Sequence, residues 1–414
     1  MKSSQIVAGL DIGSSKVAFA VGKISEGLIE ILSLNATPNA GLRKGIIIDI
    51  EDTMSAISSA LEVAERKAGA PIDKVIAGVG GAHIITALSK GIIAVSRPNG
   101  EITDQDIERV VDAAAAIALP PNQEILHVIP EQFIVDGQES VKDPTGMNGI
   151  RLEAEVMIIG GSSNALKNLE RSITQVGIKP ETLVFNGLAS TRTLLTKKQK
   201  EAGVLLLDIG ASTTTLTIWE EGELLYGNIL PIGSTHVTND IAIGLKTSLE
   251  VAEKIKIKFG DCNPENAAEG IVGLKNFDPR ETNKIEKKLI AEITEARMKE
   301  IFEKARIELK RIQKDSRLPA GVVLTGGGSQ IKGCIEMAKE ELSLPAQKGL
   351  PILGVSGAID NLNNPSFSVS IGLLLEGLDE TFRTRKESGF NFAVPKDLSG
   401  FLGKVKDFFR QLLP

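Results

Sequence analysis

The sequence predicts an α/β protein with two duplicated halves, each a sheet followed by a helix, arranged around a cleft. The first observation is a repeat: AGLDIGSSKVAFAVGKISEGL at residues 8–28 is similar to LLLDIGASTTTLTIWEEGEL at residues 205–224. The second is that each copy lies in a three-stranded pattern of apolar runs and alternation. These strands are predicted at residues 5–11, 15–23 and 27–35, and again at 203–209, 212–219 and 223–231. Such a duplication favours a ligand in the cleft between the copies.

The composition sets the broad class. With 414 residues, 42% of them hydrophobic and 24% charged, the chain is long enough for several domains and is typical of a soluble globular protein. Its net charge of −6 argues against a partner that is a nucleic acid. The two cysteines and three widely spaced histidines predict neither a zinc cluster nor a disulfide framework.

The N-terminal residues MKSSQIVAGLDIG lead directly into a strand pattern and lack the apolar core of a secretory signal. No stretch approaches the roughly 18 consecutive apolar residues of a spanning helix. We therefore expect a protein that is made and kept in the cytoplasm, where thiols stay reduced.

Both copies of the repeat turn at Asp-Ile-Gly followed by small residues. Glycine lets a ligand approach the backbone closely, and successive N–H groups in such a turn form an anion-binding concavity. An aspartate would repel a phosphate, so its expected role is to hold water on a Mg²⁺ ion that neutralises the phosphates. A plain hairpin turn would use the same residue types, but their recurrence in matching settings favours a binding site. The residues are Asp11, Gly13, Ser14 and Ser15 in the first turn and Asp208, Gly210, Ala211 and Ser212 in the second.

A helix is predicted downstream of each three-stranded unit. The segments SALEVAERKAG at residues 59–69 and TSLEVAEKIKIKFG at residues 247–260 both have apolar residues at helical spacing. The repeat therefore extends beyond the hairpin to a sheet-plus-helix unit.

A third motif, GVVLTGGGSQIKGCIEMAKEEL at residues 321–342, is typical of a buried strand, three glycines and an amphipathic helix. Gly326, Gly327 and Gly328 leave room for an adenine or ribose to lie flat, and the following helix N-terminus favours anionic oxygens. The segment MIIGGSSNALKNL at residues 157–169 has a comparable shape. A tight packing turn is the alternative interpretation of both segments.

In this order, the elements resemble the nucleotide-binding signature of the actin-like ATPase superfamily, which includes actins, chaperone ATPases and sugar kinases. Residues 10–19 resemble its first phosphate loop, residues 205–218 its second, and residues 322–337 its adenosine motif. The segments VFNGLASTRTLL at 184–195 and PSFSVSIGLLL at 365–375 lie where its two interdomain connecting helices belong.

Within the superfamily the chain resembles the FtsA family of bacterial cell-division proteins over essentially its whole length. Residues 41–69 and 75–84 are similar to that family's N-terminal subdomain, and PIGSTHVTNDIAIGLKTSLEVAEKIKIKFG at 231–260 is similar to its most recognisable block. The stretch from Ile84 to about Ser163 matches a subdomain that this family inserts and that sugar kinases and chaperones lack.

The resemblance implies a division into subdomains. These are 1A (residues 1–83, 164–197 and 358–378), the inserted 1C (84–163), 2A (198–236 and 321–357) and 2B (237–320).

The resemblance also assigns roles in binding ATP and Mg²⁺. The phosphate contacts would be Gly13, Ser14, Ser15 and Lys16 on one side and Gly210, Ala211 and Ser212 on the other. Asp11 and Asp208 would face the metal through water, and Asp208 would also position the attacking water. Glu253 and Lys256, one helical turn apart, occupy the places that contact ribose or adenine. The alternative for this pair is a solvated ion pair on a helix face.

Two departures from the superfamily pattern bear on hydrolysis. The second phosphate loop usually runs Asp-x-Gly-Gly-Gly-Thr with another aspartate further on, whereas this chain has Ala211, Ser212 and Thr215 in those places. The first connecting helix often begins with Glu-Pro, whereas here it begins with Asn186-Gly187. Binding through backbone amides tolerates these changes, but hydrolysis needs a positioned water. We therefore expect ATP binding with weak or absent ATPase activity.

The last residues predict a membrane tether. Residues 379–399 have the mixed composition of a flexible linker, and residues 400–414 predict an amphipathic helix. Residues 380–414 carry seven Lys or Arg and four Asp or Glu, which suits an anionic leaflet. A helix that docks back on the body is the alternative. The apolar stripe, about 140° wide at 100° per residue, consists of Phe401, Leu402, Val405, Phe408, Phe409, Leu412 and Leu413.

The resemblance thus implies a division protein that tethers filaments of the tubulin-like FtsZ to the cytoplasmic face of the membrane at the division site. Its implied partners are the C-terminal tail of FtsZ at subdomain 2B, further copies of itself in a filament, later division proteins at subdomain 1C, and anionic lipid. Two alternatives remain open: a pilus-assembly actin-like protein, which shares the insert but typically lacks a terminal membrane helix, and a small-molecule kinase. The sequence offers no acceptor-site general base for a kinase.

Overall fold

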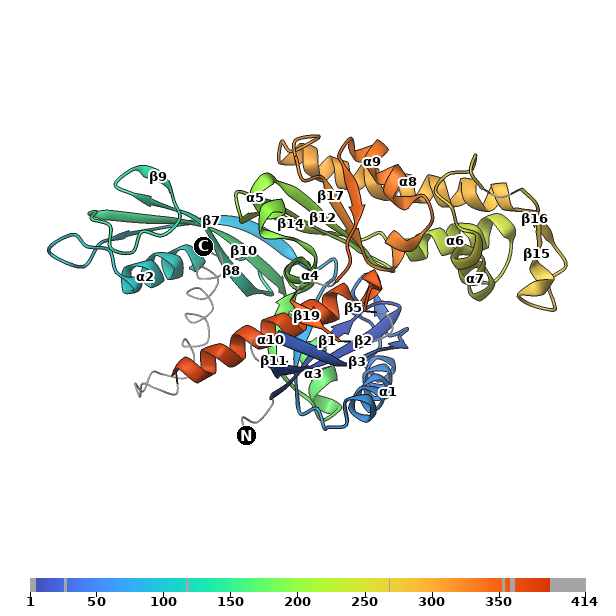
Figure 1. The fold of residues 1–414 in the computed structure, drawn as a ribbon, viewed down its shortest axis with the longest axis horizontal. Helices are drawn as coiled ribbons and strands as arrows, with labels where there is room; N and C mark the ends of the chain where they lie inside the picture. Colours follow the sequence, from blue (N-terminus) through green and yellow to red (C-terminus); the bar gives the residue numbers. More distant parts are fainter. Residues whose placement is uncertain are drawn as a thin grey trace.

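The computed structural model describes residues 5–25, 28–116, 119–267, 269–351, 354–357 and 362–387. Its first half is a six-stranded sheet in the order β11-β6-β1-β2-β3-β19 (Figure 1). The first three strands form the predicted antiparallel meander, and β6 and β11 extend it as parallel strands. The bounds are β1 (Gln5–Ile12), β2 (Lys16–Ser25), β3 (Leu28–Pro38), β6 (Lys74–Val79), β11 (Lys179–Phe185) and β19 (Val355–Ser356), with a small hairpin of β4 (Leu42–Arg43) and β5 (Ile46–Ile47).

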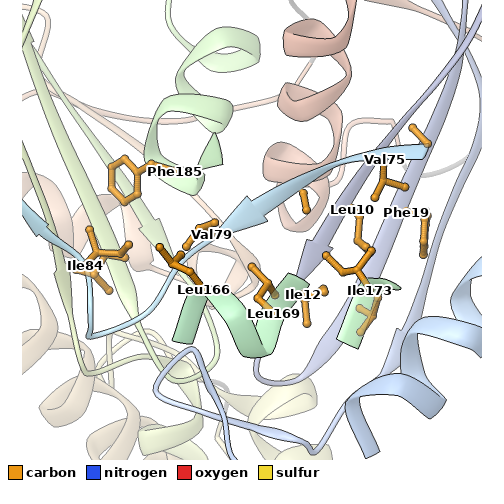
Figure 2. Packing of buried hydrophobic residues seen from close by; sticks show 14 of the residues in the cluster. Leu10, Ile12, Phe19, Val75, Val79, Ile84, Leu166, Leu169, Ile173 and Phe185 are labelled. Carbon is orange, nitrogen blue, oxygen red and sulfur yellow. The ribbon is translucent and has the colours of Figure 1, made fainter. Parts of the chain in front are cut away.

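Alternation along β2 decides which helices cover each face of this sheet. Val17 and Phe19 point to the face covered by α1 (Ile50–Ala68) and α3 (Ser163–Gln175), where Leu10, Leu166 and Ile173 join them in one cluster (Figure 2). Ala18 and Ala20 point to the opposite face, covered by α10 (Ser368–Glu387). Small residues there let α10 come close to the sheet.

The predicted helix at residues 59–69 belongs to α1, which begins earlier, at Ile50. Asp49 caps the start, because its side chain accepts a hydrogen bond from the Asp52 amide at 2.9 Å. Gly69 ends the helix in a left-handed conformation with φ 69°.

The second half is a five-stranded sheet in the order β14-β13-β12-β17-β18, and its first three strands form the second predicted meander. On one face and beside it lie α6, the predicted α7, α8 and α9. The bounds are β12 (Val204–Ile209), β13 (Thr214–Glu220), β14 (Glu223–Leu230), β17 (Val322–Thr325), β18 (Ala346–Lys348), the hairpin β15 (Ile271–Gly273) and β16 (Lys284–Glu286), α6 (Ser234–Leu245), α7 (Leu249–Phe259), α8 (Lys287–Arg311) and α9 (Cys334–Leu342).

A third sheet is inserted between β6 and α3, in the order β7-β10-β8-β9 with one helix on its face. It projects from one end of the molecule, while α7 and the β15–β16 hairpin lie at the other end (Figure 1). The bounds are β7 (Ile85–Ala94), α2 (Asp104–Ala115), β8 (Gln123–Val135), β9 (Gln138–Val141) and β10 (Arg151–Ser162).

Two helices connect the halves, as predicted. These are α4 (Asn186–Leu194), followed by the short α5 (Lys197–Ala202), and α10, preceded by the single turn η3 (Pro365–Phe367). They cross at Gly372, where an added Cβ would lie 1.9 Å from the Ala189 carbonyl oxygen. Beside the crossing, Arg192 and Glu376 form an ion pair at 3.0 Å.

The predicted linker is wrong for its first residues. Helix α10 continues to Glu387, because the charged run from Asp379 contains neither glycine nor proline before Gly389. The rest of the predicted linker and the predicted membrane helix at 400–414 lie outside the described residues. Among the residues that the structure describes, no helix is both long and apolar enough to span a membrane.

The helix crossing gives a stability test. We expect Gly372→Ala to lower the free energy of unfolding by about 1–3 kcal/mol, because the added methyl group must displace the Ala189 carbonyl. Gly377→Ala on the same helix is the matched control, since its nearest contacts would be an ordinary 3.4 to 3.5 Å. That control should leave stability unchanged or raise it by up to about 1 kcal/mol. Denaturant unfolding measures the stability of both variants. Equal unfolding midpoints for Gly372→Ala and Gly377→Ala would contradict the tight contact between α10 and α4.

Candidate functional site

The two repeated turns have the same backbone geometry and meet face to face. The Gly13 amide donates to the Lys16 carbonyl at 2.9 Å in the first, and the Gly210 amide donates to the Thr213 carbonyl at 2.9 Å in the second. The Ser212 hydroxyl donates to the Ser14 hydroxyl oxygen at 2.6 Å, although 198 positions separate them in sequence. The structure therefore brings together the two turns that the repeat predicts.

The first turn is held from outside by residues that the sequence analysis missed. The Asn39 side chain donates to the Gly13 carbonyl at 2.9 Å, and the Asn39 amide donates to the Ser15 carbonyl at 3.0 Å. The Gly45 amide donates to the Ser14 hydroxyl oxygen at 3.2 Å. No spacing in the sequence marks these residues, because their role depends on the fold of the loop after β3.

The second turn is held by the start of α6. The Ser234 amide donates to the Gly210 carbonyl at 2.9 Å, and the Thr235 amide donates to the Ala211 carbonyl at 2.8 Å. These bonds satisfy amides that a helix N-terminus leaves without intrahelical partners. They fix the second turn to the helical layer of its own half.

Two carboxylates lie at the ends of equivalent strands, Asp11 on β1 and Asp208 on β12. Burial raises the pKa of Asp11 to about 6, partly offset by the nearby Lys16 ammonium and by a hydrogen bond from the Asn186 side chain. Burial raises the pKa of Asp208 to about 7, the charge of Asp11 raises it further, and Lys16 partly offsets both effects. The two carboxylates therefore form a site in which the negative charge is incompletely compensated by the protein itself.

Lys16 links the first turn to the second connecting helix. Its ammonium donates to the Ser366 carbonyl oxygen at 2.6 Å and lies 4.3 Å from the centre of the Phe367 ring. Burial lowers its pKa, while Asp11 and Asp208 raise it. Lys16 thus lies within the electrostatic field of both carboxylates, with its ammonium bound to the turn η3 just before α10.

Of the three glycines after β17, only Gly327 faces open space, because no atom of the described residues beyond its chain neighbours lies within 4 Å of the Cβ that it lacks. An added Cβ on Gly326 would lie 2.2 Å from a carboxylate oxygen of Asp208, and one on Gly328 would lie 2.4 Å from the Ile209 side chain. Two of the glycines therefore allow close packing against the end of β12. Packing also explains residues 157–169, where Gly160 and Gly161 lie within β10 against neighbouring elements.

The helix predicted to follow the glycines directly is displaced. A single 3₁₀ turn, η2 (Gly327–Gln330), comes first, and α9 begins only at Cys334. Gly333, in a left-handed conformation with φ 75°, forms the break between them. Cys334 contacts Cys262, both are buried free thiols, and their hydrogen bond together with burial raises the pKa of Cys262.

Glu253 and Lys256 form an ion pair at 2.7 Å, but not on a solvated face. Lys256 is only 7% exposed, and its ammonium also donates to the Thr238 hydroxyl at 2.9 Å and to the Ser234 carbonyl at 3.3 Å. The pair therefore joins α7 to the start of α6, which in turn supports the second turn. The solvated alternative is wrong for Lys256, whereas the Glu253 side chain is 44% exposed.

Asn186, noted in the sequence only as a departure, lies beside Asp11. Its side chain lies near enough to Asp11 to lower the pKa of that carboxyl, and its amide group fills the space left by Gly78 and Gly80 at the end of β6. Among the residues that the structure describes, its buried Oδ1 atom has no hydrogen-bond partner. An unpartnered buried acceptor next to a carboxylate is typical of a site that completes its bonding with a ligand or water.

The comparisons with known proteins identify the family. The family model described as cell division protein FtsA matches residues 205–372, and that described as the SHS2 domain inserted in FtsA matches residues 81–160. The FtsA protein of Pseudomonas aeruginosa is 37% identical over 382 residues, 92% of this chain and 91% of that protein. The Bacillus subtilis protein is 35% identical, covering 90% of this chain and 84% of its own length. The chain belongs to the FtsA family. The predicted resemblance is confirmed.

Solved structures agree on the fold. The PilM–PilN type IV pilus biogenesis complex gives a TM-score of 0.66 at 18% identity and covers 90% of this chain and 98% of its own. MreB5 of Spiroplasma citri bound to ADP gives 0.55 at 13% identity, over 93% of this chain and 99% of its own. The predicted actin-like fold with an FtsA-type insert is therefore confirmed.

The raised pKa of Asp208 predicts that removing this charge stabilises the ligand-free FtsA protein. A folded pKa of about 7, against an ordinary 3.8, means that stability falls as pH rises through this range. At about pH 8, Asp208→Asn should therefore raise the free energy of unfolding by on the order of 1 kcal/mol. The difference should shrink toward about pH 5, where the parent carboxyl is protonated in the folded state. Calorimetric unfolding at both pH values tests this, and a less stable variant at the higher pH would contradict it.

Proposed function

We propose that this FtsA protein binds Mg·ATP between its two turns and uses that state to organise an FtsZ-tethering filament at the membrane. The observation that carries the nucleotide proposal is the meeting of the turns at Ser14 and Ser212, with Asp11 and Asp208 near the ends of the strands that lead into them. Neighbours of the same fold include MreB5 structures with ADP and with AMPPNP.

The electrostatics of the turns fit Mg·ATP better than ATP alone. Two neighbouring carboxylates with pKa values raised to about 6 and about 7 favour a nearby cation. Bound Mg²⁺ would supply that charge and would neutralise the phosphates. Asp11 and Asp208 would hold it through water, while Lys16 and the amides and hydroxyls of Gly13, Ser14, Ser15, Gly210, Ala211 and Ser212 would bind the phosphates.

The adenosine would lie beside Gly327, between the glycine turn and α7. The open space at Gly327 and the partly exposed carboxylate of Glu253 support this assignment. Lys256 would act indirectly, because its ammonium is committed to Glu253, Thr238 and Ser234.

We propose that ATP turnover is slow. The residue closest to the role of a water-positioning acid at the first connecting helix is Asn186, whose amide can orient a water but cannot take its proton. Asp208 is the remaining candidate for positioning the water. Replacement of acidic residues by Asn186 and Thr215 therefore favours a protein that binds ATP as a structural ligand.

The proposals for assembly and partner binding rest on the positions of the two outermost subdomains. Subdomains 1C (84–163) and 2B (237–320) project in opposite directions from the 1A and 2A units, which suits a head-to-tail contact between copies. Such contacts do not close and so build filaments. We assign the FtsZ tail to 2B and later division proteins to 1C, as the family resemblance implies.

The C-terminal residues would attach the filament to the membrane. Phenylalanines and aliphatic residues at 401–413 would enter an anionic leaflet, with flanking Lys and Arg near the headgroups. One such helix binds reversibly, so several copies along a filament would be needed for a firm tether. Pilus assembly has less support, because identity to the pilus complex is 18% against 37% to FtsA.

Gly327 gives a test of nucleotide binding that leaves the fold intact. Gly327→Leu should abolish measurable Mg·ATP binding in titration calorimetry, because its side chain occupies open space that the adenosine needs. Gly273→Leu, at a glycine of the β15 hairpin whose added Cβ would lie 3.9 Å from the Asn276 side chain, should bind like the parent. Unchanged ATP affinity for folded Gly327→Leu would place the adenosine elsewhere, and a parent that binds no ATP would refute the proposal.

The membrane proposal is tested with full-length protein and vesicles containing anionic phospholipid. Phe408→Glu with Phe409→Glu puts two charges in the apolar stripe and should move the protein from the vesicle pellet to the supernatant. Ser399→Glu with Gln411→Glu adds the same charge outside the stripe and should reduce binding only in part. Sedimentation of the phenylalanine variant at the level of the parent would show that this helix is not the anchor.

A further inference from the structure

The corner where β11 becomes α4 is held by a hydrogen bond to the inserted sheet. The Phe185 amide, the last of β11, donates to Nε2 of His127 on β8 at 2.9 Å. Since Nε2 accepts this bond, the neutral ring carries its proton on Nδ1. One side chain of the insert therefore fixes the backbone at the start of a connecting helix.

The Phe185 ring is packed equally tightly. Phe185 is fully buried, and a Cβ added to Gly187 would lie 2.6 Å from its ring. Gly227 on β14 lies under the same ring, and its carbonyl accepts a hydrogen bond from the Thr86 hydroxyl on β7 at 2.9 Å. The insert, the first half and the second half thus all meet at this corner.

The next residue extends these contacts to the end of β1, just before the first turn. Asn186 is adjacent in sequence to Phe185, fills the space above Gly78 and Gly80, and lies beside Asp11. A shift of the Phe185 backbone would move Asn186, and therefore the amide that lies beside Asp11. The contacts run without interruption from β8 to the end of β1.

We propose that His127 is a positioning residue through which the insert holds Asn186 against Asp11 and couples its own docking to nucleotide binding. The coupling part rests on the proposed binding of Mg·ATP. Because such coupling is reciprocal, a partner that moves the insert changes the affinity for nucleotide, and nucleotide changes the docking of the insert by the same factor.

The test compares His127→Leu, which removes the acceptor, with His127→Gln, whose side-chain oxygen can reach the same amide. Thr86→Val is the matched control, because it removes another insert hydrogen bond without touching the corner backbone. Hydrogen exchange of residues 183–195 is measured without ligand, and Mg·ATP affinity is measured by calorimetry.

We expect His127→Leu to speed exchange across this segment and to weaken Mg·ATP binding about fivefold or more. His127→Gln should restore both, and Thr86→Val should leave both near parent values. If His127→Leu does not fold, His127→Asn replaces it, since its shorter side chain stays polar but does not reach the amide. A second comparison adds Asn186→Ala, in whose background the His127 substitution should no longer affect ATP affinity.

Two outcomes overturn the inference. Unchanged exchange in His127→Leu would show that His127 does not position the corner, whatever the protein binds. Faster exchange with unchanged ATP affinity would show that the corner is not coupled to the nucleotide. If instead the parent binds no ATP, the proposed function and the coupling fail together, and the exchange measurement still decides the positioning role.

Discussion

The two halves of the fold meet at the hydrogen bond between Ser14 and Ser212, which joins turns from two separate sheets. Each turn ends a strand that carries an aspartate, so the same convergence brings Asp11 and Asp208 into one electrostatic environment. Neither carboxylate would have a strongly raised pKa on an isolated exposed hairpin. The duplicated fold therefore creates a site that favours a cation and anionic oxygens.

The site is also tied to the elements that connect the two halves. Lys16 leaves the first turn and bonds to Ser366 just before α10, and Asn186 begins α4 beside Asp11. These helices cross with almost no space between Gly372 and Ala189. A change of ligand at the turns would act directly on both connections, which is how hinge motions are coupled to ligands in proteins of two lobes.

The sequence predicted the elements whose signals are local. Period-two alternation and the repeated Asp-Ile-Gly turns located both meanders, and helical spacing located α7 and part of α1. Contacts between distant residues could not be predicted in this way. The bond from Lys16 to Ser366 spans 350 positions, and the closeness of Gly326 to Asp208 depends on the neighbouring parallel strands β12 and β17. Burial of Lys256 similarly depends on how α6 packs on α7, which the helix pattern alone leaves open.

The central claim is that nucleotide phosphates occupy the place where the two turns meet. A Ser14→Cys and Ser212→Cys double variant tests it through disulfide formation under mild copper-catalysed oxidation, with the parent as control because Cys262 and Cys334 are buried. Calorimetry first establishes an ATP concentration that saturates the variant. We expect rapid cross-linking without ligand and strong protection by saturating Mg·ATP. Cross-linking at the same rate with and without bound Mg·ATP would contradict it.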